Sequence, residues 1–178
     1  ADSKGCIEAT NYLALLQLDG KIVDFDIEKA TENLKKGVEL ENSDSMVYLG
    51  LLYKAQNINI DEMVSLFKKS ADLNNPRGML NYGYCLRTGL GIDKNLEEAA
   101  VYYKNSCDGG CEKGMNAYAK CLELGIGVEK NEKKALALYK SAMRLDNPEA
   151  TRNLGCMYED GRGVQQSFSK ALHYYKKA

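Results

Sequence analysis

A small residue recurs at a nearly constant interval along the chain, and this interval restricts the possible folds more than any other feature. The spacings between successive positions are 36, 33, 36 and 36 residues, and each position lies in the middle of an amphipathic segment. The residues are Ala14, Gly50, Gly83, Ala119 and Gly155. A period of this length is typical of stacked helix pairs. About five such units account for the whole chain of 178 residues.

Glycines occupy a second fixed place in the period, six residues after the small residue in four of the units. In the last three units another glycine follows two residues later. The two sets are Gly20, Gly89, Gly125 and Gly161, then Gly91, Gly127 and Gly163. Because glycine adopts the left-handed conformation of a helix C-terminus at little cost, these positions predict the end of the first helix of each unit.

The second helix of each unit is predicted to begin at a side chain that accepts hydrogen bonds from free helix amides. These residues are Asp26, Asn59, Asn95, Asn131 and Ser167. Asn95 with Glu98 resembles a capping box. Asn75-Pro76 and Asn147-Pro148 indicate the starts of two first helices. The second unit is three residues short around 57–61, so we expect a tighter, less regular turn there.

Each second helix carries small or flexible residues and larger apolar residues on one face. The first set is Ala30, Met63, Ala99, Ala135 and Ala171, and the second is Leu34, Phe67, Tyr103, Tyr139 and Tyr175. A single helix pair cannot bury such a face, so the units must stack. The sequence therefore predicts an all-α, right-handed α-solenoid of antiparallel helix pairs in one domain, 1–178. The expected repeats are 5–41, 42–74, 75–110, 111–146 and 147–178.

The last unit carries a long pattern of Leu-Gly, then Tyr, then Gly-x-Gly-Val, then Lys-Ala and Tyr-Lys across residues 150–178. This pattern resembles a Sel1-like repeat of the tetratricopeptide-like superfamily. The third and fourth units match it well and the first two more loosely. The resemblance implies the roles of such proteins: adaptors in membrane-associated quality control, activators of other enzymes, and bacterial virulence or signalling factors. It identifies a fold and not a partner.

The balance of charge gives no reason to expect a nucleic-acid or membrane partner. The chain has 24 basic and 25 acidic side chains, and its apolar stretches are shorter than a membrane-spanning helix requires. It begins without a methionine, so we expect a piece of a longer protein or a processed form. With no signal peptide in view, we expect a cytoplasmic protein that binds proteins or peptides.

The cysteines are interpreted mainly as buried, free thiols. Cys85 and Cys121 share a register on the first helices and Cys156 lies one residue away, which suits small apolar core residues. In one secreted bacterial branch of the Sel1-like family that this chain resembles, each unit has two cysteines at a fixed spacing. This chain lacks that pattern. Cys107 and Cys111 flank the turn at 108–110, and this pair alone is expected to be able to form a disulfide.

The sequence contains no set of residues with the types and spacing that a metal site or a catalytic site requires. Cys107 and Cys111 supply half of a zinc site, and no second pair with suitable spacing appears. The single histidine, His173, lies far along the array from most thiols, so no cysteine–histidine nucleophile is expected. The glycine pairs end helices and precede no Gly-Lys-Ser/Thr, which favours helix termination over a phosphate loop. We therefore expect no metal, no cofactor and no enzymatic activity.

The candidate binding residues lie at a register that varies between units, two residues before the central small residue. It holds Tyr12, Tyr48, Asn81, Ala117 and Asn153, and a helical wheel places it toward the inner, concave wall. Nearby Asn11, Arg87, Asn116 and Lys120 extend the set. Amides and tyrosines on a rigid groove can bind the backbone of a partner segment. The alternative for each residue is an ordinary solvated surface or a contact between units.

Two functions follow from these expectations. The leading hypothesis is a non-catalytic scaffold or adaptor that binds a partner segment on the concave face. The alternative is a regulatory repeat module that activates or recruits a catalytic or membrane domain elsewhere in a longer chain. The sequence contains no feature that separates the two.

Overall fold

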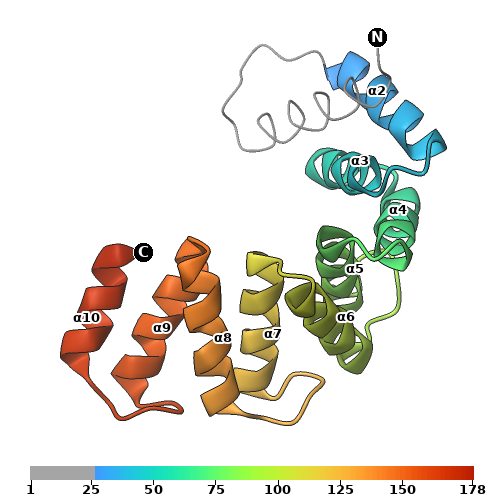
Figure 1. The fold of residues 1–178 in the computed structure, drawn as a ribbon. Coiled ribbons are helices and arrows are strands. Elements are labelled where there is room, and N and C mark those ends of the chain that lie inside the picture. Colours follow the sequence, from blue (N-terminus) through green and yellow to red (C-terminus); the bar gives the residue numbers. More distant parts are fainter. Residues whose placement is uncertain (1–26) are drawn as a thin grey trace. The chain divides into compact units, whose positions relative to one another are not determined.

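The computed structural model describes residues 27–178, which form nine α-helices and no strand (Figure 1). The helices are α2 (Ile27–Glu39), α3 (Ser43–Gln56), α4 (Ile60–Asp72), α5 (Pro76–Thr88), α6 (Leu96–Asp108), α7 (Glu112–Leu124), α8 (Glu132–Arg144), α9 (Pro148–Asp160) and α10 (Phe168–Lys177). The all-α repeat fold predicted from the sequence is confirmed. The predicted positions Asn11, Tyr12, Ala14, Gly20 and Asp26 lie outside the described residues.

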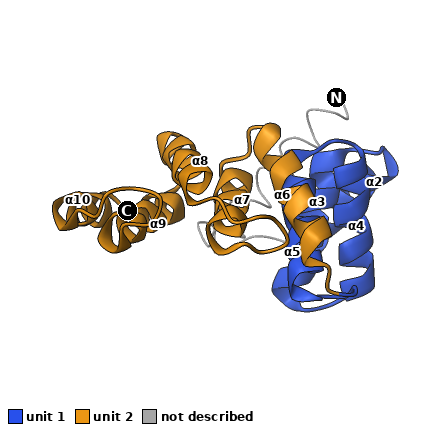
Figure 2. Cartoon of the chain, turned by 90° about the horizontal axis from the view of Figure 1, so that it is seen from below, with its two compact units in different colours: residues 1–93 blue, residues 94–178 orange. Residues whose placement is uncertain are grey.

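The chain divides into two compact units, residues 1–93 and 94–178, hereafter unit 1 and unit 2 (Figure 2). In unit 1, helix α3 packs against α2, α4 and α5. In unit 2, each of the helices α6 to α10 packs against its neighbours in chain order. Helix pairs such as α3–α4 and α9–α10 correspond to the predicted repeats, while the single domain over 1–178 stays a prediction.

The helix starts follow the predicted caps with one exception. The Asn95, Asn131 and Ser167 side chains accept the backbone N–H three residues later, at 3.0, 3.0 and 3.4 Å. Asn59 was predicted to do the same, and this prediction is wrong. Its backbone is left-handed, with φ of 49°, so its side chain makes no cap hydrogen bond. Asn57 is also left-handed, which confirms the irregular turn expected in the shortened second repeat.

The predicted glycines end the first helices. Gly89, Gly125 and Gly161 follow α5, α7 and α9 with φ between 71° and 76°. A side chain at these angles would be strained, whereas glycine is not. At Gly127 a Cβ atom would also collide with the Leu96 and Glu97 backbone, because this loop lies directly on the start of α6.

A second set of small residues determines how closely successive helices of a unit cross. In unit 1, a Cβ at Gly78 of α5 would overlap Ser70 of α4, and in unit 2 a Cβ at Gly114 of α7 would overlap Ser106 of α6. Both serines are fully buried, and the Ser70 hydroxyl donates to the Ser43 carbonyl at 2.9 Å. These contacts bring helix backbones together where larger side chains would hold them apart.

The large residues of the second helices fill the core next to the small residues of the first helices. The Phe67 ring lies against Gly50, and Tyr139 is fully buried. Tyr175 was expected in the core as well, and this expectation is wrong: 37% of it is exposed, although its ring packs on Gly155. Its other side is not covered by any further helix of the described part of the chain.

We expect Gly114→Ala to destabilise the protein. Alanine favours a helix over glycine by about 1 kcal/mol, but here the added methyl would overlap Ser106 and its backbone. The overlap should outweigh that gain and give a net loss of about 1–3 kcal/mol in unfolding free energy. Urea unfolding followed by circular dichroism measures the change. Ser141→Ala on α8 is the control, and a Gly114→Ala protein more stable than wild type would disprove the close crossing.

Candidate protein-interaction face

In unit 1, the predicted residues Tyr48 of α3 and Asn81 of α5 are joined through an arginine. The Arg77 Nη1 donates to the Tyr48 hydroxyl oxygen at 2.7 Å, and the Asn81 Nδ2 donates to the Arg77 carbonyl at 2.8 Å. Tyr48 is buried and Asn81 is half-buried. Sequence reasoning missed Arg77, although it lies one helical turn before Asn81 and therefore on the same face.

A cationic cluster occupies the later turns of the same two helices. The Lys54 Nζ of α3 lies 3.7 Å from the centre of the Tyr84 ring on α5, and the Arg87 guanidinium carbon lies 5.4 Å from it. Cations at this range are attracted to the face of an aromatic ring. Arg87 was a predicted binding residue, whereas Lys54 and Tyr84 were not. Tyr84 lies seven residues after Arg77, two helical turns along the same face.

In unit 2, Asn116 of α7 and Asn153 of α9 contact each other directly. The Asn153 Nδ2 donates to the Asn116 Oδ1 at 3.0 Å. Asn116 is buried, Asn153 is half-buried, and Lys120 is exposed one turn after Asn116. The two asparagines therefore bridge first helices of neighbouring repeats, which was the structural alternative considered for them. We call Tyr48 and Asn81 the first-helix face of unit 1, and Asn116, Lys120 and Asn153 the first-helix face of unit 2.

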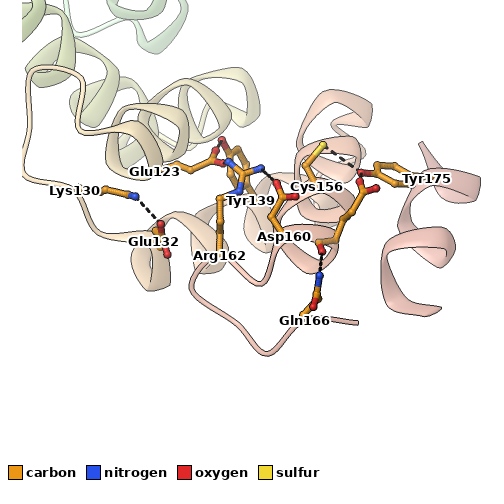
Figure 3. Close-up of polar contacts among 10 residues, drawn as sticks. Glu123, Lys130, Glu132, Tyr139, Cys156, Asp160, Arg162, Gln166 and Tyr175 are labelled. Atoms are coloured by element: carbon orange, nitrogen blue, oxygen red, sulfur yellow. Dashed lines mark hydrogen bonds and ion pairs between the residues drawn. The ribbon is translucent and has the colours of Figure 1, made fainter. Parts of the chain in front are cut away.

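Unit 2 also holds a buried polar cluster that was not predicted (Figure 3). The Tyr139 hydroxyl donates to Glu123 Oε2 at 2.6 Å, and the Arg162 Nη1 is paired with Glu123 Oε1. Arg162 lies in the turn after α9, where its Nη2 also contacts Asp160 at 2.9 Å. A carboxylate as buried as Glu123 requires such partners, because removing it from water is costly.

The recurrence of this cluster was a signal available in the sequence. Glu123 and Glu159 are 36 residues apart, as are Tyr139 and Tyr175. Tyr175 donates to Glu159 just as Tyr139 does to Glu123. Burial and the carboxylate hydrogen bond raise the pKa of Tyr139 well above its usual value, so its hydroxyl remains a donor over the ordinary pH range.

The five cysteines of the described chain are free thiols. Cys85, Cys111 and Cys121 are buried, while Cys107 and Cys156 are half-buried. Burial is the main cause that raises the pKa of Cys85, to about 11, and it raises that of Cys107 as well. The pairing of Cys107 with Cys111 stays a prediction.

Other chemistry has no candidate site in the part of the chain that the structure describes. Residues 27–178 contain no group of three or more His, Cys, Asp and Glu side chains arranged to hold a metal ion. His173 is exposed on α10. None of the helices over the same range is long and apolar enough to cross a membrane.

We expect the cysteines to react in two classes with a small alkylating reagent. At pH 8 only about one part in a thousand of a thiol with a pKa of about 11 is ionised, and the thiolate is the reacting form. Half-buried Cys107 and Cys156 should therefore be modified first, and Cys85, Cys111 and Cys121 only after unfolding. Peptide mass spectrometry over time distinguishes the sites. Equal rates at Cys85 and Cys156 in the folded protein would contradict this prediction.

We expect Tyr139→Phe to lower the unfolding free energy by about 1–2 kcal/mol, because the buried Glu123 carboxylate loses one hydrogen bond while the ring packing is kept. Tyr84→Phe is the matched control, since the Tyr84 ring lies beneath Lys54 and its hydroxyl takes no part in that contact. Urea unfolding of both variants gives the comparison. Equal stabilities for the two variants would show that the Tyr139 hydroxyl contributes nothing.

Comparison with known proteins connects these helix pairs to a family. The Sel1 repeat model matches residues 7–42, 76–111, 113–147 and 148–178, which leaves the shortened second repeat unmatched. No curated protein matches the chain.

Solved structures of Sel1 repeat proteins show the same fold. A Sel1 repeat protein from Oxalobacter formigenes matches with a TM-score of 0.80 and 26% identity, over 96% of this chain and 69% of that one. Cysteine rich protein B of Helicobacter pylori gives 0.58 and 28%, over 74% and 96%. The protective antigen c5321 of uropathogenic Escherichia coli gives 0.51 and 22%, over 98% and 46%, and supports the fold alone. Because the family model covers most of its length, the chain belongs to the Sel1 repeat family.

Proposed function

We propose that the chain is a non-catalytic scaffold that binds an extended segment of a partner protein on the first-helix face of either unit. Sel1 repeat proteins generally mediate protein–protein interactions and act as non-catalytic repeat scaffolds. The observation that carries the proposal is the pairing of Asn116 with Asn153, because it leaves one donor and one acceptor side by side.

The hydrogen-bonding groups that this pair leaves without a partner match those of a peptide group. Asn153 uses its NH₂ group on the Asn116 Oδ1. The Asn153 Oδ1 and the Asn116 NH₂ group have no partner among the described residues. A peptide unit presents one N–H and one C=O, which are the complement of that set. The amides are held by a neighbouring helix, so little side-chain entropy is lost when a segment binds.

Unit 1 offers the same combination from different residues. The Tyr48 hydroxyl accepts from Arg77 and keeps its own proton to donate. The Asn81 NH₂ group is used on the Arg77 carbonyl, and its side-chain oxygen has no partner within residues 27–178. Each unit therefore presents a donor and an acceptor on its first helices.

The charges around these groups favour a partner segment that carries carboxylates. In unit 1, Lys54 and Arg87 lie near the Tyr84 ring and Arg77 bonds Tyr48, and in unit 2 Lys120 is exposed. Ion pairs at exposed positions contribute about 0–1 kcal/mol each, so they would select among partners more than determine affinity.

The test begins with a displayed library of random peptides selected on the wild-type protein. We expect the selected peptides to be enriched in Asp and Glu, and to bind Asn81→Ala or Asn153→Ala more weakly by about 1–2 kcal/mol, or about five- to thirtyfold in Kd. Both variants should keep the wild-type circular dichroism spectrum.

Asn105→Ala is the matched control, because Asn105 is an exposed asparagine on the second helix α6. The proposal fails if the selected peptides bind all three variants equally. It also fails if Asn81→Ala and Asn153→Ala unfold the protein, since those side chains would then serve the fold.

A further inference from the structure

Two contacts between a cation and a tyrosine join helices α3 and α5 of unit 1. In the first, the Arg77 Nη1 donates to the Tyr48 hydroxyl oxygen at 2.7 Å. In the second, the Lys54 Nζ lies 3.7 Å from the centre of the Tyr84 ring. We call them the arginine contact and the lysine contact. Within residues 27–178, neither of the two cations is paired with a carboxylate.

Helix geometry gives the separation of the two contacts along the first helices. Arg77 and Tyr84 are seven residues apart on α5, and Tyr48 and Lys54 are six residues apart on α3. At a rise of about 1.5 Å per residue, these intervals span about 10 and 9 Å, so the two helices give nearly the same spacing. Unit 1 therefore holds two positive charges about 9–10 Å apart on one face.

A hydrogen-bond acceptor lies between the two contacts. Asn81 is one helical turn after Arg77 and nearly one turn before Tyr84 on α5. Its NH₂ group donates to the Arg77 carbonyl at 2.8 Å, and its side-chain oxygen has no partner among the described residues. A bound segment can satisfy that oxygen with a backbone N–H that is not used elsewhere. Because the interior of an α-helix has no such N–H, the acceptor favours an extended segment over a helical one.

We propose that unit 1 recognises a partner segment in the polyproline II conformation with two acidic side chains three residues apart. The inference rests on the scaffold function proposed above and specifies the segment that its first-helix face binds. In polyproline II, residues three apart lie on the same side and about 9 Å from each other, which matches the two contacts. In a β-strand, side chains on the same side are about 7 or 13 Å apart. One carboxylate pairs with Arg77 and the other with Lys54, while a backbone N–H between them donates to Asn81.

The charges beyond the two contacts differ between the two ends of this site. The Arg87 guanidinium carbon lies 5.4 Å from the centre of the Tyr84 ring, so a second cation stands near the lysine contact. At the other end, the exposed Asp44 lies one turn before Tyr48 on α3, and its Oδ1 accepts from Asn75 at 2.8 Å. Asp44 repels an acidic side chain placed beyond the arginine contact. The site therefore favours a pair of carboxylates over a long acidic run.

The probes are three fluorescein-labelled peptides of equal length and composition, built from proline, alanine and two glutamates. The glutamates are three residues apart in the first peptide, two in the second and five in the third. Fluorescence anisotropy with the whole chain should show saturable binding of the first peptide. It should bind about fivefold more tightly than the other two, because only its carboxylates reach both cations at once.

Substitution of either cation should remove this preference. In Lys54→Gln and Arg77→Gln the three peptides should bind alike, since one of the two ion pairs is lost. Lys69→Gln is the matched control, because Lys69 is an exposed lysine on the second helix α4 of the same unit. Circular dichroism checks that the variants are folded, and the comparison of the three peptides on the wild-type protein requires no variant.

The inference is overturned if none of the peptides saturates, if all three bind the wild-type protein equally, or if the preference survives both substitutions. It is also overturned if a helical peptide with glutamates seven residues apart binds more tightly than the first peptide. Asn81→Ala separates this inference from the scaffold function. If peptides selected from the library lose affinity in that variant while the three probes bind alike, the scaffold function stands and the proposed spacing is wrong.

Discussion

The close crossing of successive helices at small residues is the constraint on which the other features of each unit depend. Gly78 against Ser70 in unit 1 and Gly114 against Ser106 in unit 2 leave no room for an added Cβ. Within a helix pair a small residue has the same role, because Gly50 of α3 leaves room for the Phe67 ring of α4. A wider separation of that pair would leave the ring partly unpacked and forfeit its dispersion contacts.

The buried Glu123 shows how an array with an apolar core accommodates charge. Tyr139 and Arg162 occupy both of its oxygens, so the carboxylate gains partners from a second helix and from a following turn. Removing one partner of such a group is costly, whereas the complete set contributes little net stability. The ion pair instead fixes geometry, because Arg162 holds the turn after α9 against Glu123 of α7.

The sequence predicts what depends on local chemistry and misses what depends on neighbours. Helix starts and ends were predicted correctly at the caps Asn95, Asn131 and Ser167 and at the glycines that follow the first helices. Both depend on local backbone geometry, and their recurrence every 36 residues makes them recognisable in the sequence. Asn59 was predicted wrongly because the shortened repeat puts its backbone in the left-handed region. A contact between units was one alternative for Asn116 and Asn153, but the sequence could not identify their pairing, because it joins residues 37 positions apart on helices whose rotation no local pattern specifies. Tyr175 has a core register, but burial also requires a covering helix.

One register shows how packing and recognition divide the positions of the repeat. Lys54, Arg87, Glu123 and Glu159 are equivalent by spacing, and their charge changes sign along the chain. Four residues before Lys54, Gly50 receives Phe67, which has no hydroxyl to bond, so no carboxylate is needed there. Lys54 instead lies over the Tyr84 ring of α5. In the last two repeats the second helix supplies Tyr139 and Tyr175, and the position is a glutamate that accepts the tyrosine hydroxyl. The third repeat has Tyr103 on its second helix and Arg87 at the position, so a tyrosine alone does not require a carboxylate there. The position therefore holds a charge that can serve either the core, as Glu123 does, or the surface, as Lys54 does.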